Sequence, residues 1–328
     1  MRGDFFAIGL DEFLEACELG MNPAVSLLVM ARGTGRDNAT TSWSALSVWQ
    51  HTGIARRRAK EAIEALIEKE IVELIEIKAG KFPKYIIRKP EDSKRILWLP
   101  NTIIDGAASE VPPVTKLRET GNIDLLQKFV QLYGIQDLDS DGGIPRDVAR
   151  STFDREKICP IGHIILYGFS NENTTATSSG LFDGYGDRTD EDENSGAWTV
   201  LEPLIQMGLL EKVYYMAESS ESNAELIYPV GQHGTGDAIW ELMTWLEEGD
   251  GKGFAFQAQG HEAQGIVPKH IKNAAMVGLY RLLYRPKTGK TSRWLAIEME
   301  QAEAMVGLVS QICREKRSTV HIKVSQGS

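Results

Sequence analysis

The segment from Thr41 to Arg88 is the most informative stretch of the chain, and it reads TSWSALSVWQHTGIARRRAKEAIEALIEKEIVELIEIKAGKFPKYIIR. A helix is predicted over residues 42–51, and it ends at Thr52-Gly53, where glycine accepts the positive φ of a tight turn. A second helix is predicted over residues 55–69. The apolar residues that recur along it at helical spacing are Ala62, Ile63, Leu66 and Ile67. The segment therefore predicts two helices joined by a tight turn.

Two short runs typical of β-strands follow the second helix, IVELIEI at 71–77 and KYIIR at 84–88. The residues between them, Lys78 to Pro83, are predicted to form the tip of a hairpin. Basic residues gather at the start of the second helix and around this tip: Arg56, Arg57, Arg58, Lys60, Lys81 and Lys84. A helix with a basic N-terminal end beside a basic hairpin is typical of modules that read DNA.

The segment resembles the winged helix-turn-helix family of bacterial transcriptional regulators and the DNA-binding domains of plasmid and phage replication initiators. The residues that carry the resemblance are the Thr41-Ser42 lead, Leu46, the Thr52-Gly53-Ile54 turn, the basic run and the exit from Leu66 to Val72. One departure is Ala55, because such heads usually have Ser or Thr there, which caps the helix and can contact phosphate. The resemblance implies a fold class more than a function.

The resemblance also implies how the module contacts DNA. The N-terminal end of helix 55–69 is expected to read the major groove, and the wing at 78–84 is expected to hold the flanking backbone. Arg58 either shares the groove-facing surface or leans on the domain, since it lies one turn before Ala62. The expected DNA-binding residues are Ser42, Thr52, Arg56, Arg57, Arg58, Lys60, Lys81 and Lys84. The alternative for the basic run is a solvated helix face that binds nothing.

A second copy of the helix-to-strand pattern is found 138 residues further on, where EPLIQMGLLEKVYY at 202–215 aligns with EALIEKEIVELIEI at 64–77. This repeat predicts a second winged-helix domain, although any helix–turn–strand boundary gives a similar pattern. Its helix carries no Lys or Arg between Gly196 and Met207, and its hairpin tip carries Glu218 and Glu221, which phosphate repels. We therefore expect this copy to dimerise or to bind a protein partner.

The resulting expectation is a mainly α fold with small β wings (α+β), made of tandem winged-helix domains and a helical C-terminal region. Residues 1–97 are expected to form the DNA-binding domain and residues 98–119 a linker. Residues 120–230 are expected to form the second domain, with an acidic loop at 171–196 that is poor in apolar residues. Residues 231–328 are expected to be helical.

Basic and aromatic residues are interleaved in the C-terminal region. The aromatic residues are Tyr280, Tyr284 and Trp294, and the basic ones are Lys269, Lys272, Arg281, Arg285, Lys287, Lys290 and Arg293. Such a mixture can hold phosphates and stack bases, which makes these residues candidate secondary nucleic-acid contacts. The other interpretation is a core helix whose basic residues face water.

The chain has a formal net charge of −10, and this charge is unevenly distributed. Residues 1–95 contain 15 Lys and Arg against 14 Asp and Glu, so the acidic excess lies in the remainder. This balance disfavours a protein that coats nucleic acid without regard to sequence, since non-specific affinity comes from neutralised phosphates. A locally basic helix on an acidic chain favours site-selective binding.

The sequence lacks the motifs that announce catalysis or metal binding. KTGKTS at 287–292 ends like a phosphate-binding loop, but Tyr284 stands where that motif needs a glycine. The six histidines have no paired ligand spacing, and the acidic loop 171–196 lacks the spacing of a calcium-binding loop. We therefore expect no enzymatic activity, no cofactor and no metal.

The cysteines Cys17, Cys159 and Cys313 form no CxxC pair, which predicts reduced thiols in a cytoplasmic protein without a membrane span. The expected function is sequence-specific binding of double-stranded DNA by a transcriptional regulator, acting as a homodimer and contacting a protein partner through its acidic second half. Two alternatives stay open. One is a plasmid or phage replication initiator at repeated origin sites. The other is a non-catalytic winged-helix subunit of a mobile-element or defence assembly.

Overall fold

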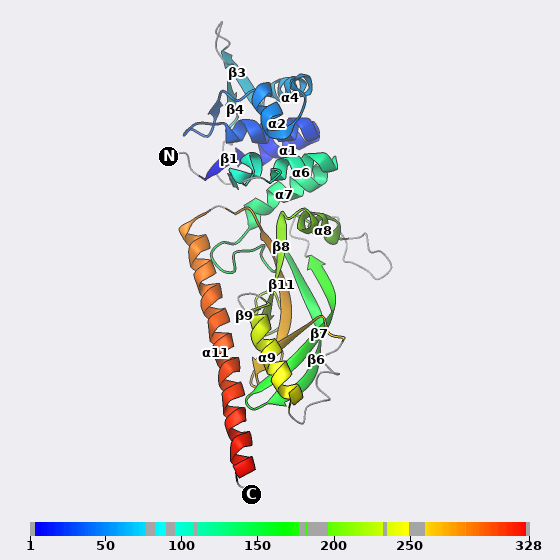
Figure 1. Cartoon of the computed structure of the whole chain (residues 1–328). Coiled ribbons are helices and arrows are strands. Elements are labelled where there is room, and N and C mark those ends of the chain that lie inside the picture. Colours follow the sequence, from blue (N-terminus) through cyan, green and yellow to red (C-terminus); the bar gives the residue numbers. More distant parts are fainter. Residues whose placement is uncertain are drawn as a thin grey trace. The chain divides into compact units, whose positions relative to one another are not determined.

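A computed structural model describes residues 4–76, 83–89, 96–107, 110–176, 181–182, 196–231, 235–248, 260–285 and 287–325 (Figure 1). The chain divides into two compact units. Unit 1 comprises residues 1–136 with two later segments, 200–211 and 282–288. Unit 2 comprises residues 137–199, 212–281 and 289–328. Each unit therefore contains segments that are distant in sequence.

Unit 1 is mostly helical. In chain order its elements are β1 (Phe5–Gly9), α1 (Leu10–Glu18), α2 (Met21–Arg32), β2 (Thr40–Thr41), α3 (Ala45–Thr52), α4 (Arg56–Glu68), β3 (Val72–Glu76), β4 (Lys84–Ile87), β5 (Ile96–Pro100), α5 (Thr102–Asp105), α6 (Pro113–Thr120), α7 (Ile123–Ile135) and most of α8 (Trp198–Gln206). Helix α2 lies at the centre, since all its residues from Pro23 to Ala31 are buried. It packs against α1, α3 and α4, which explains why its sequence is apolar on every side.

Two small sheets complete unit 1. Strands β2, β4 and β3 form an antiparallel sheet in that order, in which Thr41 pairs with Tyr85 and Val72 with Ile87. Strand β1 pairs antiparallel with β5, from Phe5 opposite Pro100 to Gly9 opposite Ile96. Residues 98–119, which the sequence assigns to a linker, thus contribute the end of β5, all of α5 and most of α6 to this unit.

Unit 2 is built on a six-stranded antiparallel sheet that is nearly closed into a barrel, in the order β10-β7-β6-β11-β8-β9. Its elements are β6 (Ala149–Ile161), β7 (Ile164–Ala176), β8 (Leu210–Ala217), β9 (Leu226–Val230), α9 (Thr235–Glu248), β10 (Ala263–Pro268), β11 (Ala275–Leu282) and α11 (Gly289–Ser325). The first two residues of β8 and the last of β11 belong to unit 1. Strands β6 and β7 form a long hairpin that turns between Ile161 and Ile164.

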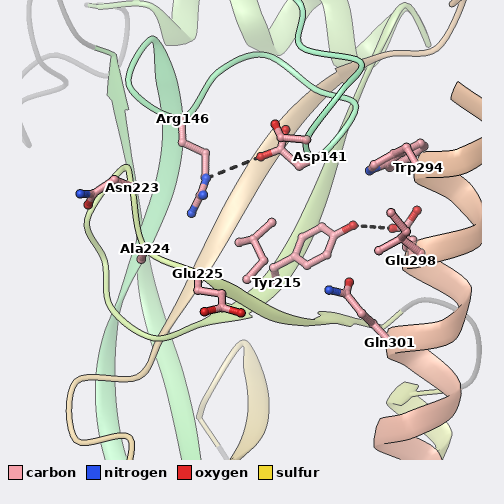
Figure 2. Close-up of a pocket in the computed structure, with 12 residues that line it drawn as sticks. Asp141, Arg146, Tyr215, Asn223, Ala224, Glu225, Trp294, Glu298 and Gln301 are labelled. Carbon is pink, nitrogen blue, oxygen red and sulfur yellow. Dashed lines mark hydrogen bonds and ion pairs between the residues drawn. The ribbon is translucent and has the colours of Figure 1, made fainter. Parts of the chain in front are cut away.

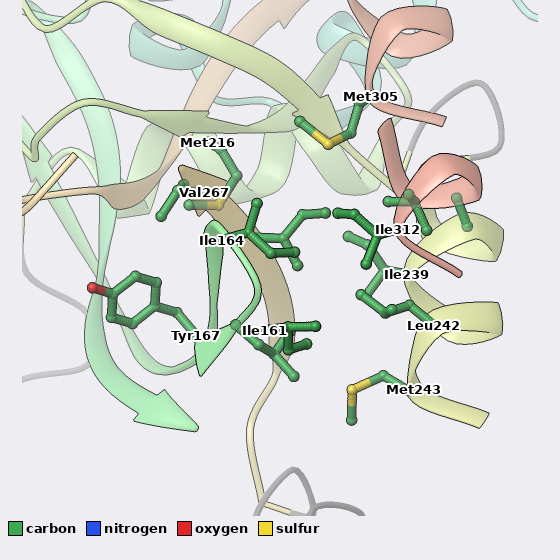
Figure 3. Close-up of a cluster of buried hydrophobic side chains, with 14 of the residues drawn as sticks. Ile161, Ile164, Tyr167, Met216, Ile239, Leu242, Met243, Val267, Met305 and Ile312 are labelled. Carbon is green, nitrogen blue, oxygen red and sulfur yellow. The ribbon is translucent and has the colours of Figure 1, made fainter. Parts of the chain in front are cut away.

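The core of unit 2 lies between this sheet and the helices α9 and α11 (Figure 3). The sheet contributes residues such as Ile164 and Val267, α9 contributes Leu242, and α11 contributes Met305 and Ile312. Burying each such side chain stabilises the fold by about 1.5–3 kcal/mol. The apolar stripe of α11 is therefore the means by which this 37-residue helix is held on the sheet.

The expected fold class is wrong. The structure has 43% helix and 28% strand, and its largest sheet is far more than a small wing. Strands β8 and β9 form the hairpin that the repeat at 202–215 predicts, but they are joined to four further strands in one sheet and do not form a second winged-helix domain. Residues 231–328, expected to be helical, supply β10 and β11 to that sheet. Strand pairing across the sheet is non-local, so it does not appear in local periodicity.

The region expected to be an acidic loop at 171–196 is partly strand, because β7 continues to Ala176. Leu181 and Phe182 are buried, and most of the remaining loop, including its acidic run, lies outside the described residues. Among the helices described here, none is both long and apolar enough to cross a bilayer.

Candidate nucleic-acid interface

Helix α4 has one buried face and one basic face. The buried residues are Ala59, Ala62, Ile63 and Leu66, and this side of the helix packs against α2 and α3. Arg56, Arg57, Arg58 and Lys60, here called the basic face, are all exposed on its first two turns. Arg58, which the sequence leaves ambiguous, is thus directed to solvent with the other three. Burial of one side of α4 fixes the orientation of the cations on the other.

The ion pairs made by the basic face are weak. Arg57 Nη1 lies 2.9 Å from Glu61 Oε1, and Lys60 Nζ lies 3.4 Å from Glu64 Oε1, both at i,i+4 spacing. All four side chains are more than half exposed. Exposed pairs of this type contribute only about 0.3–0.5 kcal/mol each. An incoming phosphate or base edge can therefore replace the carboxylates at little cost.

Arg56 is held differently. Its guanidinium carbon lies 4.7 Å from the centroid of the Trp49 ring on α3, and Trp49 is 43% exposed. Trp49 therefore lies beside the basic face and is not a core residue. At an exposed site this cation–π contact contributes about 0.5–1 kcal/mol. It keeps Arg56 against α3 and reduces the number of rotamers that the side chain samples.

The turn between α3 and α4 is fixed by several local contacts. Gly53 ends α3 with φ 73°, and its backbone N–H donates to Trp49 O. Thr52 Oγ1 donates to Val48 O at 2.6 Å and accepts from Ile54 N at 3.3 Å. Thr52 is buried with its hydroxyl engaged, so it positions the turn and is not available to DNA, contrary to the expectation from sequence.

The remaining expected contacts lie at the surface where they are described. Ser42 is exposed before α3, and Lys84 is exposed at the start of β4, opposite Glu76. Lys81 and Phe82 lie outside the described residues. Trp43 is partly buried and stacks on His51 at 4.6 Å, and burial lowers the pKa of the His51 imidazole.

Several of the interleaved residues of the C-terminal region are buried or ion-paired. Arg281 is 1% exposed, Tyr280 and Trp294 are buried too, and none of them can meet a nucleic acid. Arg285 is paired with Glu211 at 3.3 Å and Lys290 with Asp139 at 2.7 Å. The exposed members are Lys269, Lys272, Lys287, Lys290 and Arg293. Base stacking on Tyr280 and Trp294 is therefore excluded, whereas the exposed cations stay predicted phosphate contacts.

Arg281 instead belongs to a buried polar network in unit 2. Its Nη1 donates to Glu298 Oε1 at 3.1 Å and its Nη2 donates to Tyr215 Oη at 2.6 Å, while the Tyr215 hydroxyl donates to the same carboxylate at 2.7 Å. Its guanidinium carbon lies 4.0 Å from the Trp294 ring centroid. Burial raises the pKa of the Tyr215 phenol well above its ordinary value.

Within the described part of the chain, no cluster of three or more His, Cys, Asp or Glu is arranged to hold a metal, and the three cysteines are buried and free. Comparison with protein-family models, with curated proteins and with solved structures found no match for this chain. Its function is therefore inferred from the basic face of unit 1.

Proposed function

We propose that this chain is a sequence-specific double-stranded DNA-binding protein that inserts the N-terminal half of α4 into the major groove. The observation that carries the proposal is the basic face: four exposed cations on the first two turns of a helix whose opposite side is fixed to the core. An α-helix with its side chains is about 10–12 Å across, and the major groove is about 12 Å wide.

The arrangement of the surrounding elements supports this proposal. The order α2, β2, α3, α4, β3, β4, with the sheet β2-β4-β3, agrees with the resemblance to winged helix-turn-helix proteins. In helix-turn-helix proteins the second helix of the pair enters the groove with its N-terminal residues. Helix α4 is that second helix here, and the basic face is at its N-terminal end.

Different residues are assigned different tasks. Arg56 and Arg57 are proposed to read base edges, because a guanidinium pairs bidentately with guanine. Lys60 and Lys84 are proposed to contact phosphates, because a flexible ammonium attracts anionic oxygens without geometric selectivity. Trp49 is proposed to orient Arg56 through the cation–π contact.

The first testable prediction concerns Arg56→Ala and Arg57→Ala. Selection of bound duplexes from a randomised pool is expected to enrich one sequence with the wild-type chain. On that sequence each variant is expected to lose about 1–3 kcal/mol, since each loses one bidentate contact, and the discrimination between sites is expected to fall with it. Fluorescence anisotropy at fixed salt measures both effects.

Lys69→Ala is the matched control, because Lys69 is an exposed cation at the opposite end of the same helix. It is expected to leave the affinity almost unchanged. The proposal fails if the wild type enriches no sequence, or if Arg56→Ala and Arg57→Ala bind the enriched sequence as tightly as Lys69→Ala does. The enriched site also separates two roles, since a dimeric regulator is expected to select a palindrome and a replication initiator is expected to bind directly repeated sites.

A further inference from the structure

Unit 2 contains a pocket of about 320 Å³ between α11, strand β8, the turn before β9 and the loop that precedes β6 (Figure 2). Asp141 and Arg146 enter it from the loop, Tyr215 from β8 and Glu225 from the turn. Trp294, Glu298 and Gln301 enter it from successive turns of α11. Its volume is at the small end of the range for ligand pockets, which is about 300–1,000 Å³.

Two charged side chains at this pocket are incompletely satisfied. Arg146 Nε lies 3.6 Å from Asp141 Oδ2, which is an ion pair without a hydrogen bond. Asp141 is 8% exposed, and among the described residues its Oδ1 and the Nη1 of Arg146 are buried without a hydrogen-bond partner. Burial raises the pKa of the Asp141 carboxyl despite the neighbouring guanidinium. Buried polar groups in folded proteins are nearly always paired, so two opposite charges that line a pocket and share only a loose ion pair indicate a place where a ligand can complete their pairing.

The chemistry of that ligand follows from these two side chains. A carboxylate oxygen accepts hydrogen bonds and prefers a cationic donor, and a guanidinium N–H donates and prefers an anionic acceptor. A molecule with an ammonium beside a carboxylate can pair with both side chains at once. Among small molecules this is the arrangement of a free α-amino acid.

The balance of charge favours a further cation on the ligand. The lining carries the carboxylates Asp141, Glu225 and Glu298 against one cation, Arg146. Glu298 is neutralised by the buried Arg281, which leaves one negative charge in excess. Glu225 is exposed at the edge of the pocket, where it can meet the side chain of a basic amino acid.

The aromatic residues of the lining disfavour a nucleobase or another flat ring. Tyr215 and Trp294 are both nearly fully buried. The Trp294 indole lies against the Arg281 guanidinium, and Gly142 approaches it so closely that an added Cβ would lie 2.6 Å from the ring. Neither ring therefore offers a bare face on which a base can stack.

We propose that unit 2 binds a free basic amino acid in this pocket, with its α-ammonium on Asp141, its carboxylate on Arg146 and its side-chain cation near Glu225. This inference concerns unit 2 alone and does not depend on DNA binding by unit 1. It names a ligand class for the part of the chain that the sequence assigns to assembly, partner binding or sensing without saying what is bound.

Isothermal titration calorimetry on the full chain tests the proposal. A first titration uses an equimolar mixture of the twenty protein amino acids, and a second uses L-lysine and three analogues that each lack one group. L-norleucine lacks the side-chain ammonium, cadaverine lacks the carboxylate and 6-aminohexanoate lacks the α-ammonium. Lysine is expected to bind most tightly, norleucine more weakly, and the last two at least about tenfold more weakly than lysine.

Three variants locate the binding. Asp141→Asn and Glu225→Gln remove one charge each without changing the shape, and Asp139→Asn is the control, because Asp139 is exposed in the same loop but outside the lining. Asp141→Asn is expected to weaken binding at least about tenfold and Glu225→Gln to remove the preference for lysine over norleucine. The proposal is overturned if no amino acid binds at about 10 mM, which corresponds to negligible affinity. It is also overturned if cadaverine or 6-aminohexanoate binds as tightly as lysine, or if Asp141→Asn binds like the control.

Discussion

Arg281 has a structural role in the core of unit 2, unlike the exposed arginines of the basic face. With Glu298 and Tyr215 it forms a buried ion pair that is bonded to a phenol and covered by Trp294. Such a pair is costly to desolvate, and its net contribution to stability is small when both partners are present. Removing one partner leaves a buried charge without compensation, and this strongly lowers the stability of the fold.

Glu298→Gln is therefore expected to lower the free energy of unfolding by about 3–5 kcal/mol, and Arg281→Met by a similar amount. The double variant Arg281→Met/Glu298→Met is expected to lose much less than the sum of the two single losses, because no isolated charge remains. Urea unfolding at pH 7 measures all three. Single losses below about 0.5 kcal/mol, which is the range of ordinary surface substitutions, would contradict the network as described.

Asp141 gives a second prediction for a single residue, now in its dependence on pH. Burial raises its pKa above the ordinary value of 3.8, so the folded state holds this proton to a higher pH than the unfolded chain does. The contribution of the Asp141 carboxyl to folding stability is therefore greatest below pH 3.8, and it falls as the pH rises through the raised pKa of the folded state.

Asp141→Asn removes this titration, so its stability relative to the wild type is expected to increase between pH 4 and pH 7. Thermal unfolding of both chains across this interval gives the difference, and Asp139→Asn reports the effect of an exposed carboxyl in the same loop. If the stability of Asp141→Asn relative to the wild type stayed constant or decreased with rising pH, burial would not be the dominant effect on the pKa of Asp141. The measurement also shows whether this variant is folded in the ligand titrations.

At the scale of elements, the sequence predicts what is local. The helices at 45–52 and 56–68 begin and end within a few residues of their predicted bounds, because the glycine turn and the apolar spacing lie within the segments themselves. The hairpin of β8 and β9 is predicted for the same reason. Thr52 is the exception in this region, because its exposure depends on packing and not on sequence position.

Strand β6 illustrates what the sequence cannot supply. Its middle residues Asp154 to Lys157 are charged and exposed, so the 13-residue strand shows no apolar alternation at its centre. It is a strand because β7 pairs with it on one side and β11 on the other. The pocket shares this limit, since Asp141, Tyr215 and Glu298 come from segments far apart in the chain, and only the sheet and α11 bring them together.

At the scale of the whole molecule, the distribution of charge limits how DNA can be bound. Residues 1–95 are nearly neutral and the remainder is strongly acidic, so the field of most of the chain repels a polyanion. The basic face and Lys84 then supply most of the favourable electrostatic term. Specific hydrogen bonds must contribute a large share of the affinity, which is the condition for discrimination between sites.

The dependence of affinity on salt tests this distribution in the full chain. Five described cations, namely the basic face and Lys84, give a slope of log K against log salt concentration of about −4.5 if all of them neutralise phosphates, and a shallower one if Arg56 and Arg57 contact bases instead. Lys84→Ala is expected to reduce the steepness by about 0.9 and to weaken binding equally on all sequences. Anisotropy titrations over a range of KCl concentrations give both numbers.

A slope near −10 would require phosphate contacts elsewhere, and the exposed Lys269 and Lys272 of unit 2 are the residues to replace next. If the Lys269→Ala/Lys272→Ala variant then gave a shallower slope, unit 2 would also contact DNA, and the restriction of binding to unit 1 would be wrong.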